Sequence, residues 1–130
     1  MILFDTHIVL ALLGQVDLVL PSPVAKEMHS NATKFVSVAT VWELAVKYRL
    51  GKLRLELPLN ALQNSLQRIQ VRILDVTVAH TLAAIGPEPA TKDPFDRLLL
   101  GVCAAERLQL LTIDRELAAH PLSWREKQGY

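Results

Sequence analysis

The feature that most constrains this sequence is the stretch from Asp93 to Asp114, DPFDRLLLGVCAAERLQLLTID. It predicts one helix, a turn and one short apolar strand, with a carboxylate at each end. Asp93 has a side chain that commonly caps a helix, Pro94 suits the first helical position, and Asp96 falls at the third. The strand, Gln109–Ile113, ends at Asp114. The stretch therefore places one acid at the start of a helix and another at the end of a strand.

The predicted helix has one apolar face, and the strand after it is apolar throughout. At helical spacing, the apolar face contains Phe95, Leu98, Leu99, Val102, Ala105 and Leu108. An uninterrupted apolar strand is typical of a parallel sheet that is buried on both faces. If the strand lies in such a sheet, Asp96 and Asp114 can both reach the edge at which parallel sheets bind ligands.

Strands alternate with helices along the whole chain. The expected strands are Ile2–Phe4, Phe35–Val38, Val71–Leu74 and Gln109–Ile113. The expected helices are His7–Leu13 capped by Thr6, Val24–Met28, one from Ser37 or Thr40 to Leu50 before Gly51, Leu59–Ile69, Thr77–Ile85, the helix that begins at Pro94, and Arg115–Ala119. Val16–Leu20 is ambiguous, and Pro121–Tyr130 has no clear pattern. This order predicts an α/β domain, best fitted by a three-layer α/β/α sandwich around a mostly parallel sheet.

Length and composition fit a single domain over residues 1–130. Hydrophobic residues make up 51% of the chain and the mean hydropathy is +0.25, yet no apolar run approaches the roughly 20 residues that cross a bilayer. The first residues, MILFDTH, lack the basic region of a signal peptide. The single cysteine, Cys103, is expected in the core and suits a reducing compartment. We therefore expect a cytoplasmic protein with no membrane partner, and the high apolar content favours a homodimer or another protein interface.

Four acids occupy comparable places in the expected fold: Asp5 ends the first strand, Glu43 lies in the helix after the second, and Asp96 and Asp114 take the positions given above. Carboxylates held together repel one another, and a hard divalent cation relieves that repulsion. All-oxygen sites suit Mg²⁺ or Mn²⁺, and these ions promote phosphodiester hydrolysis by activating water and stabilising developing charge.

Each acid also has a structural interpretation. Asp96 and Asp93 are favourable at a helix start, and Glu43 stands three residues after Thr40, as in a capping box. Asp114 and Asp5 can each cap the helix that follows. Taken singly, each acid favours this structural interpretation, but the four together favour a functional site. Asp5 in particular directly follows the apolar run Ile-Leu-Phe and is hard to explain as a solvated surface charge.

The basic residues have to be judged by position, because the formal net charge is only +1. A local cluster follows Glu43 and consists of Lys47, Arg49, Lys52 and Arg54. Together with Arg97, it either holds RNA phosphates or is a solvated helix end, where cations are favourable in any case. Trp42 is expected in the apolar stripe of its helix with Ala45, Val46 and Arg49 or Leu50, rather than as a platform for stacking bases, and Tyr48 suits either role.

Three blocks of sequence resemble the PIN-domain family, specifically the VapC-like toxins of type II toxin–antitoxin systems. They are ILFDTH, FVSVATVWELAVKYRLGKL and KDPFDRLLLGVCAAERLQLLTID, and the resemblance covers roughly residues 1–120. The family often has Asn or Ser where this chain has His7, and the tail LSWREKQGY does not resemble the usual final edge strand.

The resemblance implies a Mg²⁺- or Mn²⁺-dependent endoribonuclease with Asp5, Glu43, Asp96 and Asp114 as catalytic and metal-binding residues. It also implies an RNA substrate and a cognate antitoxin protein that covers the acidic groove. The candidate substrate-binding residues are Thr6, His7, Lys47, Arg49 and Arg97, and His7 has a packing or capping role as its alternative.

Other functions fit less well. A receiver-type phosphoacceptor domain needs paired acids after its first strand and an aspartate that ends a middle strand; a haloacid-type phosphatase needs a second aspartate where His7 stands. The remaining alternative is a catalytically silent PIN-like module that binds RNA or protein without cutting.

Overall fold

The computed structural model describes residues 1–14 and 19–127, so most of the ambiguous segment Val16–Leu20 lies outside the described residues. Within them, strands and helices alternate as expected. The elements are β1 (Ile2–Phe4), α1 (Thr6–Leu12), α2 (Ser22–Met28), β2 (Lys34–Ser37), α3 (Val38–Arg49), the 3₁₀ turn η1 (Leu59–Ala61), α4 (Leu62–Arg68), β3 (Val71–Leu74), α5 (Val78–Leu82), α6 (Pro94–Glu106), β4 (Gln109–Leu111) and α7 (Arg115–Ala118).

The strands form a four-stranded sheet in the order β3-β2-β1-β4, and every pairing is parallel. The chain builds β1, β2 and β3 toward one edge and then returns to place β4 on the other side of β1. The order therefore reverses between β1 and β4, and ligands bind in open α/β sheets at the carboxyl ends of strands beside such a reversal.

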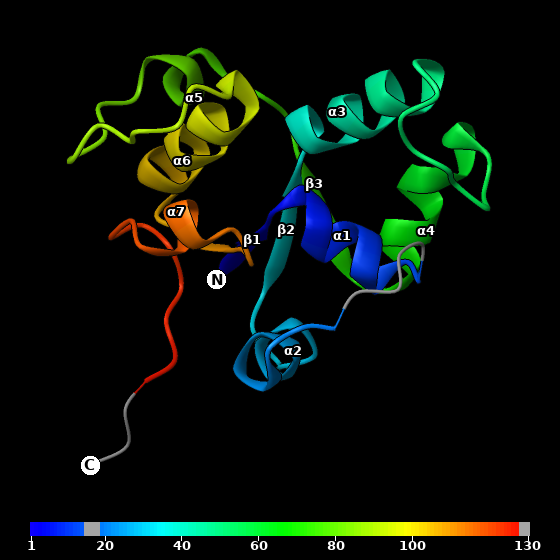
Figure 1. The fold of residues 1–130 in the computed structure, drawn as a ribbon, viewed down its shortest axis with the longest axis horizontal. Helices are drawn as coiled ribbons and strands as arrows, with labels where there is room; N and C mark the ends of the chain where they lie inside the picture. The colour runs from blue at the N-terminus through cyan, green and yellow to red at the C-terminus, as the bar shows by residue number, and fades with distance from the viewer. Residues whose placement is uncertain (15–18, 128–130) are drawn as a thin grey trace.

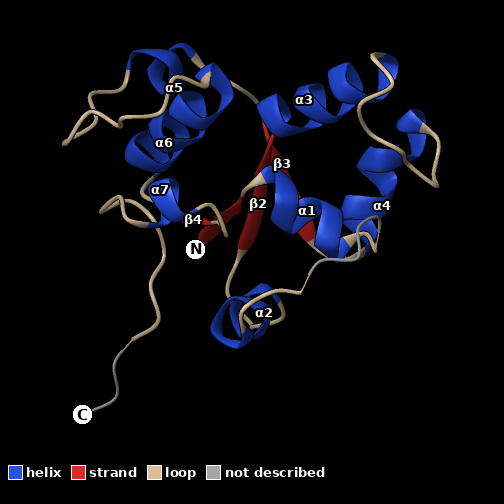
Figure 2. Cartoon of the chain, viewed as in Figure 1, coloured by secondary structure: helices blue, strands red, loops and turns tan. Residues whose placement is uncertain are grey.

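Helices cover both faces of the sheet, as Figures 1 and 2 show, with α5, α6 and α7 on one side and α1 and α4 on the other. Side chains of β1 alternate between two cores: Ile2 and Phe4 pack into the core beside α1 and α4, and Leu3 packs against α6. The expected three-layer α/β/α sandwich is confirmed, and Cys103 is fully buried in the second core, also as expected.

Helix α3 begins at Val38 because the Ser37 side chain caps it, accepting a hydrogen bond from the backbone N–H of Ala39 at 3.0 Å. Of the two expected starts, the one at Ser37 is confirmed. The capping box between Thr40 and Glu43 is wrong, since both lie inside the helix.

The apolar stripe expected on α3 is also wrong. Its buried residues are Ala39, Thr40, Glu43 and Leu44. Trp42 is 60% exposed, and Arg49 is exposed as well. The face of α3 that is buried is therefore not the face that contains Trp42, and it includes two polar residues, Thr40 and Glu43.

Several other boundaries differ from the prediction by one to three residues, and three of them have a clear cause. Asp5, rather than Thr6, is the N-cap of α1. Helix α5 ends at Leu82, because the next residue, Ala83, is extended and leads Ile85 into the second core. Strand β4 ends at Leu111, because the side chain of Thr112 turns to a hydrogen bond with Asp5.

The expected apolar face of α6 is shifted as well. The buried residues are Leu99, Leu100, Gly101, Val102 and Cys103, whereas Ala105 is exposed. A Cβ at Gly101 would lie 2.3 Å from the carbonyl oxygen of His80. Helices α5 and α6 can approach this closely only because that residue has no side chain.

The tail that the sequence pattern left unplaced lies against the outer edge of β4. The Leu110 N–H donates to the carbonyl of Leu122 at 3.0 Å, and the Trp124 N–H donates to the carbonyl of Leu110 at 2.8 Å. Ser123 forms a parallel bridge with Leu110. This segment covers an edge that would otherwise present unpaired backbone groups.

Candidate acidic active site

Asp5 is the centre of the candidate site. It directly follows β1 and is only 5% exposed. One carboxylate oxygen accepts from the backbone N–H of Thr6 at 2.7 Å, and the other accepts from the hydroxyl of Thr112 at 2.7 Å. Burial raises the pKa of Asp5 above 3.8, and these two hydrogen bonds oppose that rise. The carboxylate is therefore held in one orientation where it is poorly solvated.

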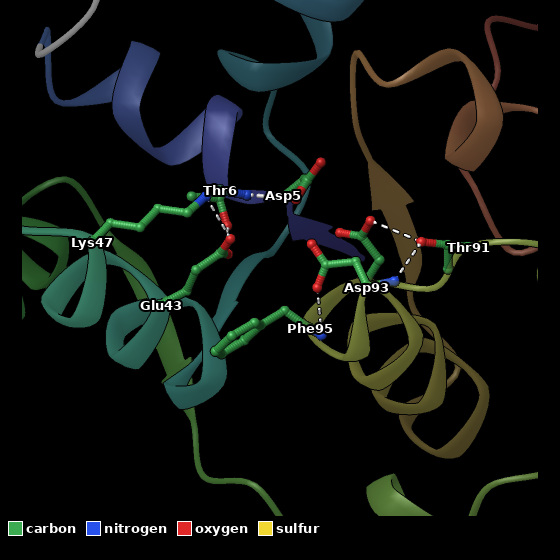
Figure 3. A network of polar contacts seen from close by, with 8 residues as sticks. Asp5, Thr6, Glu43, Lys47, Thr91, Asp93 and Phe95 are labelled. Carbon is green, nitrogen blue, oxygen red and sulfur yellow. Dashed lines mark hydrogen bonds and ion pairs between the residues drawn. The ribbon is translucent and has the colours of Figure 1, made fainter. Parts of the chain in front are cut away.

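Glu43 reaches the same place from α3, because it belongs to the buried stripe of that helix. One of its oxygens accepts a short hydrogen bond from the hydroxyl of Thr6, and the other lies 2.9 Å from the ammonium of Lys47. The hydrogen bond to Glu43 raises the pKa of Lys47. Figure 3 shows Asp5, Thr6, Glu43 and Lys47 as a connected series from the end of β1 to α3.

The start of α6 adds two further carboxylates. Asp93 caps the helix by accepting from the Phe95 N–H at 2.9 Å, as the sequence predicts. Asp96 lies in the first turn, where the Thr91 hydroxyl donates to it at 3.2 Å. The same hydroxyl accepts from the Asp93 N–H at 3.2 Å, so Thr91 ties both acids to the loop before the helix (Figure 3).

Asp96 carries the clearest electrostatic sign of a shared site. Its pKa rises from 3.8 to about 6, first because of burial and then because of the negative charges of Asp93, Asp5 and Asp114, while the hydrogen bond from Thr91 opposes the rise. Carboxylates from β1, from the start of α6 and from the loop after β4 therefore influence one another through space.

Asp114 has the structural role that the sequence left open. It is the N-cap of α7 and accepts from the Leu117 N–H at 3.0 Å. Its own N–H donates to the Thr112 hydroxyl at 3.1 Å, which places it next to the hydroxyl that holds Asp5. Capping and membership of the acidic group are therefore compatible at this position.

The donor set fits a hard divalent cation by its chemistry. It consists of carboxylate oxygens from separate elements, and the pKa values of Asp5 and Asp96 are raised first by burial and also by neighbouring negative charges, which a cation would offset. Among residues 1–14 and 19–127, no three His, Cys, Asp or Glu side chains are already arranged to hold a metal ion.

The candidate substrate-binding residues fall into two groups. Thr6 and Arg97 are already bonded to other residues of the protein. The buried Thr6 hydroxyl donates to Glu43, and the Arg97 guanidinium, nearer the surface, donates to the carboxylate of Glu88 at 2.6 Å and to the carbonyl of Ala83 at 3.1 Å. The others lie at or near the surface: His7 and Arg49 are exposed, and Lys47 is half-buried on Glu43.

Two threonines that position the acids were missed by sequence reasoning. Thr112 lies two residues before Asp114, and Thr91 lies five residues before Asp96. A polar residue at the end of an apolar strand was the available signal for Thr112. No local pattern marks Thr91, because its role depends on the return of the loop to the start of α6.

Comparison with known proteins gives one finding about the family. The family model described as "PIN domain" matches residues 2–121, which is most of the chain. No curated protein and no solved structure matches this chain. PIN domains are in general metal-dependent nucleases that bind RNA. In the described part of the chain, no helix is long and apolar enough to cross a membrane.

Proposed function

This chain belongs to the PIN-domain family, and from that premise we propose that it is a metal-dependent endoribonuclease that acts at the site of Asp5, Glu43, Asp96 and Asp114. The observation that carries the proposal is a set of hydrogen bonds: the Thr112 hydroxyl donates to Asp5 and accepts from the Asp114 N–H, and the Thr6 hydroxyl next to Asp5 donates to Glu43. These residues come from distant parts of the sequence and lie near the carboxyl end of β1, where the strand order reverses. The pKa of Asp96 is raised first by burial and then by the charges of Asp93, Asp5 and Asp114, which supports the same grouping.

In this proposal the four carboxylates hold Mg²⁺ or Mn²⁺, and the bound ion supplies an activated water and a counter-charge for the phosphate. The chain's own residues prepare the site. Thr112 and the Thr6 N–H keep both oxygens of Asp5 oriented. The Thr6 hydroxyl and the Lys47 ammonium do the same for Glu43. Such preorganisation reduces the rearrangement needed when charge develops in the reaction.

RNA phosphates are proposed to contact His7, Lys47 and Arg49, which lie at or near the surface. Arg97 acts differently in this proposal: its bonds to Glu88 and Ala83 hold the loop that presents Thr91 to Asp96. Arg97 therefore positions the loop next to the site without contacting the substrate, and Thr6 connects the end of β1 to Glu43.

The finer part of the proposal is that the chain is the toxin of a type II toxin–antitoxin system. It rests on the likeness of the three sequence blocks to VapC-like toxins. A cytoplasmic homodimer and an antitoxin that covers the acidic groove belong to this part. Exposed apolar side chains on α3 and α5, among them Val38, Val78 and Leu82, offer surface for such contacts.

The test is cleavage of RNA by the purified protein in Mg²⁺ or Mn²⁺ and in excess EDTA. We expect activity with either ion, none in EDTA, and loss of most activity in Asp5→Asn. Asp75→Asn is the matched control, because Asp75 also follows a strand, β3, and is exposed. Cleavage that persists in EDTA, or equal losses in both variants, would contradict the proposal. RNA binding without cleavage in any of these ions would favour the alternative, a PIN-like module that binds without cutting.

A further inference from the structure

We propose that Trp42 is a base-contacting residue and stacks on an unpaired base of the bound RNA. This inference rests on the proposed ribonuclease function and adds to it a residue that contributes to substrate affinity. It concerns a residue that the sequence assigned to the core and that the structure instead places at the surface, with 60% of its area exposed.

Trp42 is next to one acid in sequence and contacts the helix that carries another. In α3 it immediately precedes Glu43, which points into the site. Its ring also contacts that of Phe95, with centroids 5.5 Å apart and planes inclined at 57°. Phe95 comes from the first turn of α6, between Asp93 and Asp96. Figure 3 shows its side chain extending from α6 toward α3. The aromatic pair therefore bridges the two helices that carry Glu43 and Asp96.

The surroundings of Trp42 suit nucleic acid. An indole has a large apolar area, and the exposed part of the Trp42 ring remains available for contact with a ligand. Arg49 lies seven residues later, which is two turns along the same side of α3, and it is exposed. Lys52 follows just beyond the helix and is also exposed. An aromatic surface followed by cations is the combination with which proteins bind single strands: bases stack on the ring and phosphates follow the positive charge.

The geometry favours single strands over duplexes. A base inside a duplex already has neighbours on both faces and cannot offer one to a side chain, whereas an unpaired base can. The contact with Phe95 restricts the positions that the Trp42 ring can take, which reduces the ordering needed when a base stacks on it. Stacking on one aromatic side chain contributes enough that its removal weakens binding by about 5- to 150-fold.

The experiment uses Trp42 as its own reporter. In a Trp124→Phe background Trp42 is the remaining tryptophan, and Asp96→Asn is added so that RNA is not consumed. Short oligoadenylate is titrated in Mg²⁺, first as a single strand and then paired with oligouridylate. We expect the single strand to quench the fluorescence of Trp42 and the duplex to leave it nearly unchanged.

Variants of the otherwise native chain test the contribution to binding and turnover. Trp42→Ala should weaken binding of the single strand, raise KM about 5- to 150-fold and change kcat little. Trp42→Phe should restore most of the affinity, because it keeps an aromatic face. Leu50→Ala is the matched control, since Leu50 is equally exposed (63%) at the far end of α3. Both sites are exposed, so the three variants should fold.

Each adverse result has a separate meaning. If the protein cuts RNA and Trp42→Ala leaves KM and affinity unchanged, the stacking proposal is wrong and the ribonuclease stands. If the protein cuts no RNA but single strands still quench Trp42, the ribonuclease proposal fails and the binding role stands. If Trp42→Ala alters the mass in light scattering without altering RNA affinity, Trp42 belongs to a protein interface and the stacking proposal is wrong.

Discussion

Replacing Asp96 with asparagine should make the metal-free protein more stable while abolishing most of its activity. The pKa of Asp96 is raised from 3.8 to about 6 in the folded protein. A carboxyl whose pKa is higher in the folded state than in the unfolded chain favours folding when it is protonated. The stabilisation from the protonated Asp96 is fully present below pH 3.8 and is lost as the pH rises through about 6. At neutral pH the folded protein therefore carries an ionised group that destabilises it.

The size of the effect follows from the same shift. A rise from 3.8 to about 6 corresponds to about 3 kcal/mol at 1.36 kcal/mol per pKa unit. Asp96 is only partly buried, so water screens its interactions, and we reduce the figure to about 1–2 kcal/mol. For a domain of this length that amounts to a rise of about 3–8 °C in Tm. Asparagine keeps the oxygen that accepts from Thr91, so the substitution removes the charge and little else.

The assay is urea unfolding in EDTA at about pH 8 and again at about pH 3.5, comparing the free energy of unfolding of Asp96→Asn with that of the native chain. We expect a gain of about 1–2 kcal/mol at the higher pH and almost none at the lower, where Asp96 is already neutral. RNA cleavage measured on the same samples should be lost. A variant that is less stable at the higher pH, or equally stabilised at both, would refute the reasoning.

Asp93→Asn is the matched control, because it removes a charge from the same helix start. Asparagine caps helices about as well as aspartate, so the bond from the Phe95 N–H is retained. Losing a negative charge near Asp96 should lower the pKa of Asp96 somewhat and change the free energy of unfolding by no more than about 0.5 kcal/mol. Activity should persist. Activity lost at Asp93 and retained at Asp96 would reverse the assignment of the two residues.

Four further predictions follow from single contacts. Thr112→Val should lower the free energy of unfolding by about 1–3 kcal/mol at neutral pH, because Asp5 loses a buried donor. The pKa of Asp5 should rise further in this variant, so the loss of stability should shrink as the solution is acidified. Thr112→Ser keeps the hydroxyl and should retain most of the stability. Thr40→Val should raise the free energy of unfolding by about 1 kcal/mol with normal cleavage, since the Thr40 hydroxyl is buried with no hydrogen-bond partner among the described residues; a loss of cleavage would assign that hydroxyl to the site. Burial raises the pKa of Cys103 to about 12, so a thiol reagent should modify the native protein only as fast as it unfolds, and rapid labelling would contradict that burial. Mg²⁺ at about 100 times its Kd should stabilise the native chain by about 2.7 kcal/mol and Asp96→Asn by much less, as thermal scans in EDTA and in Mg²⁺ would show; equal gains would place the ion elsewhere.

The elements that the sequence predicted well are those whose boundaries depend on neighbouring residues. Asp93, Pro94 and Asp96 carry the chemistry of a helix start within one turn, and α6 begins where they predict. The apolar run Ile2–Phe4 ends at a charge, and β1 ends there. The parallel α/β sandwich followed as well, because the alternation of apolar strands with helices leaves few other ways to bury both faces. The positions of Asp5 and Asp96 near one edge are a consequence of that architecture.

The tertiary structure decided which face of each helix is buried and which distant side chains meet. On α3 the sequence favours Trp42 as a core residue, but in the packed protein the buried residues of that helix include Thr40 and Glu43, and the indole is mostly exposed. Asp5 and Thr112 are 107 residues apart and bond only because β4 lies beside β1. The bonds of Thr91 to Asp96 and of Thr6 to Glu43 depend in the same way on the return of a loop and on one helix packing against another. Local propensity specifies where an element begins and ends, but contacts between elements are set by the packing of the whole chain, and the candidate site consists mainly of such contacts.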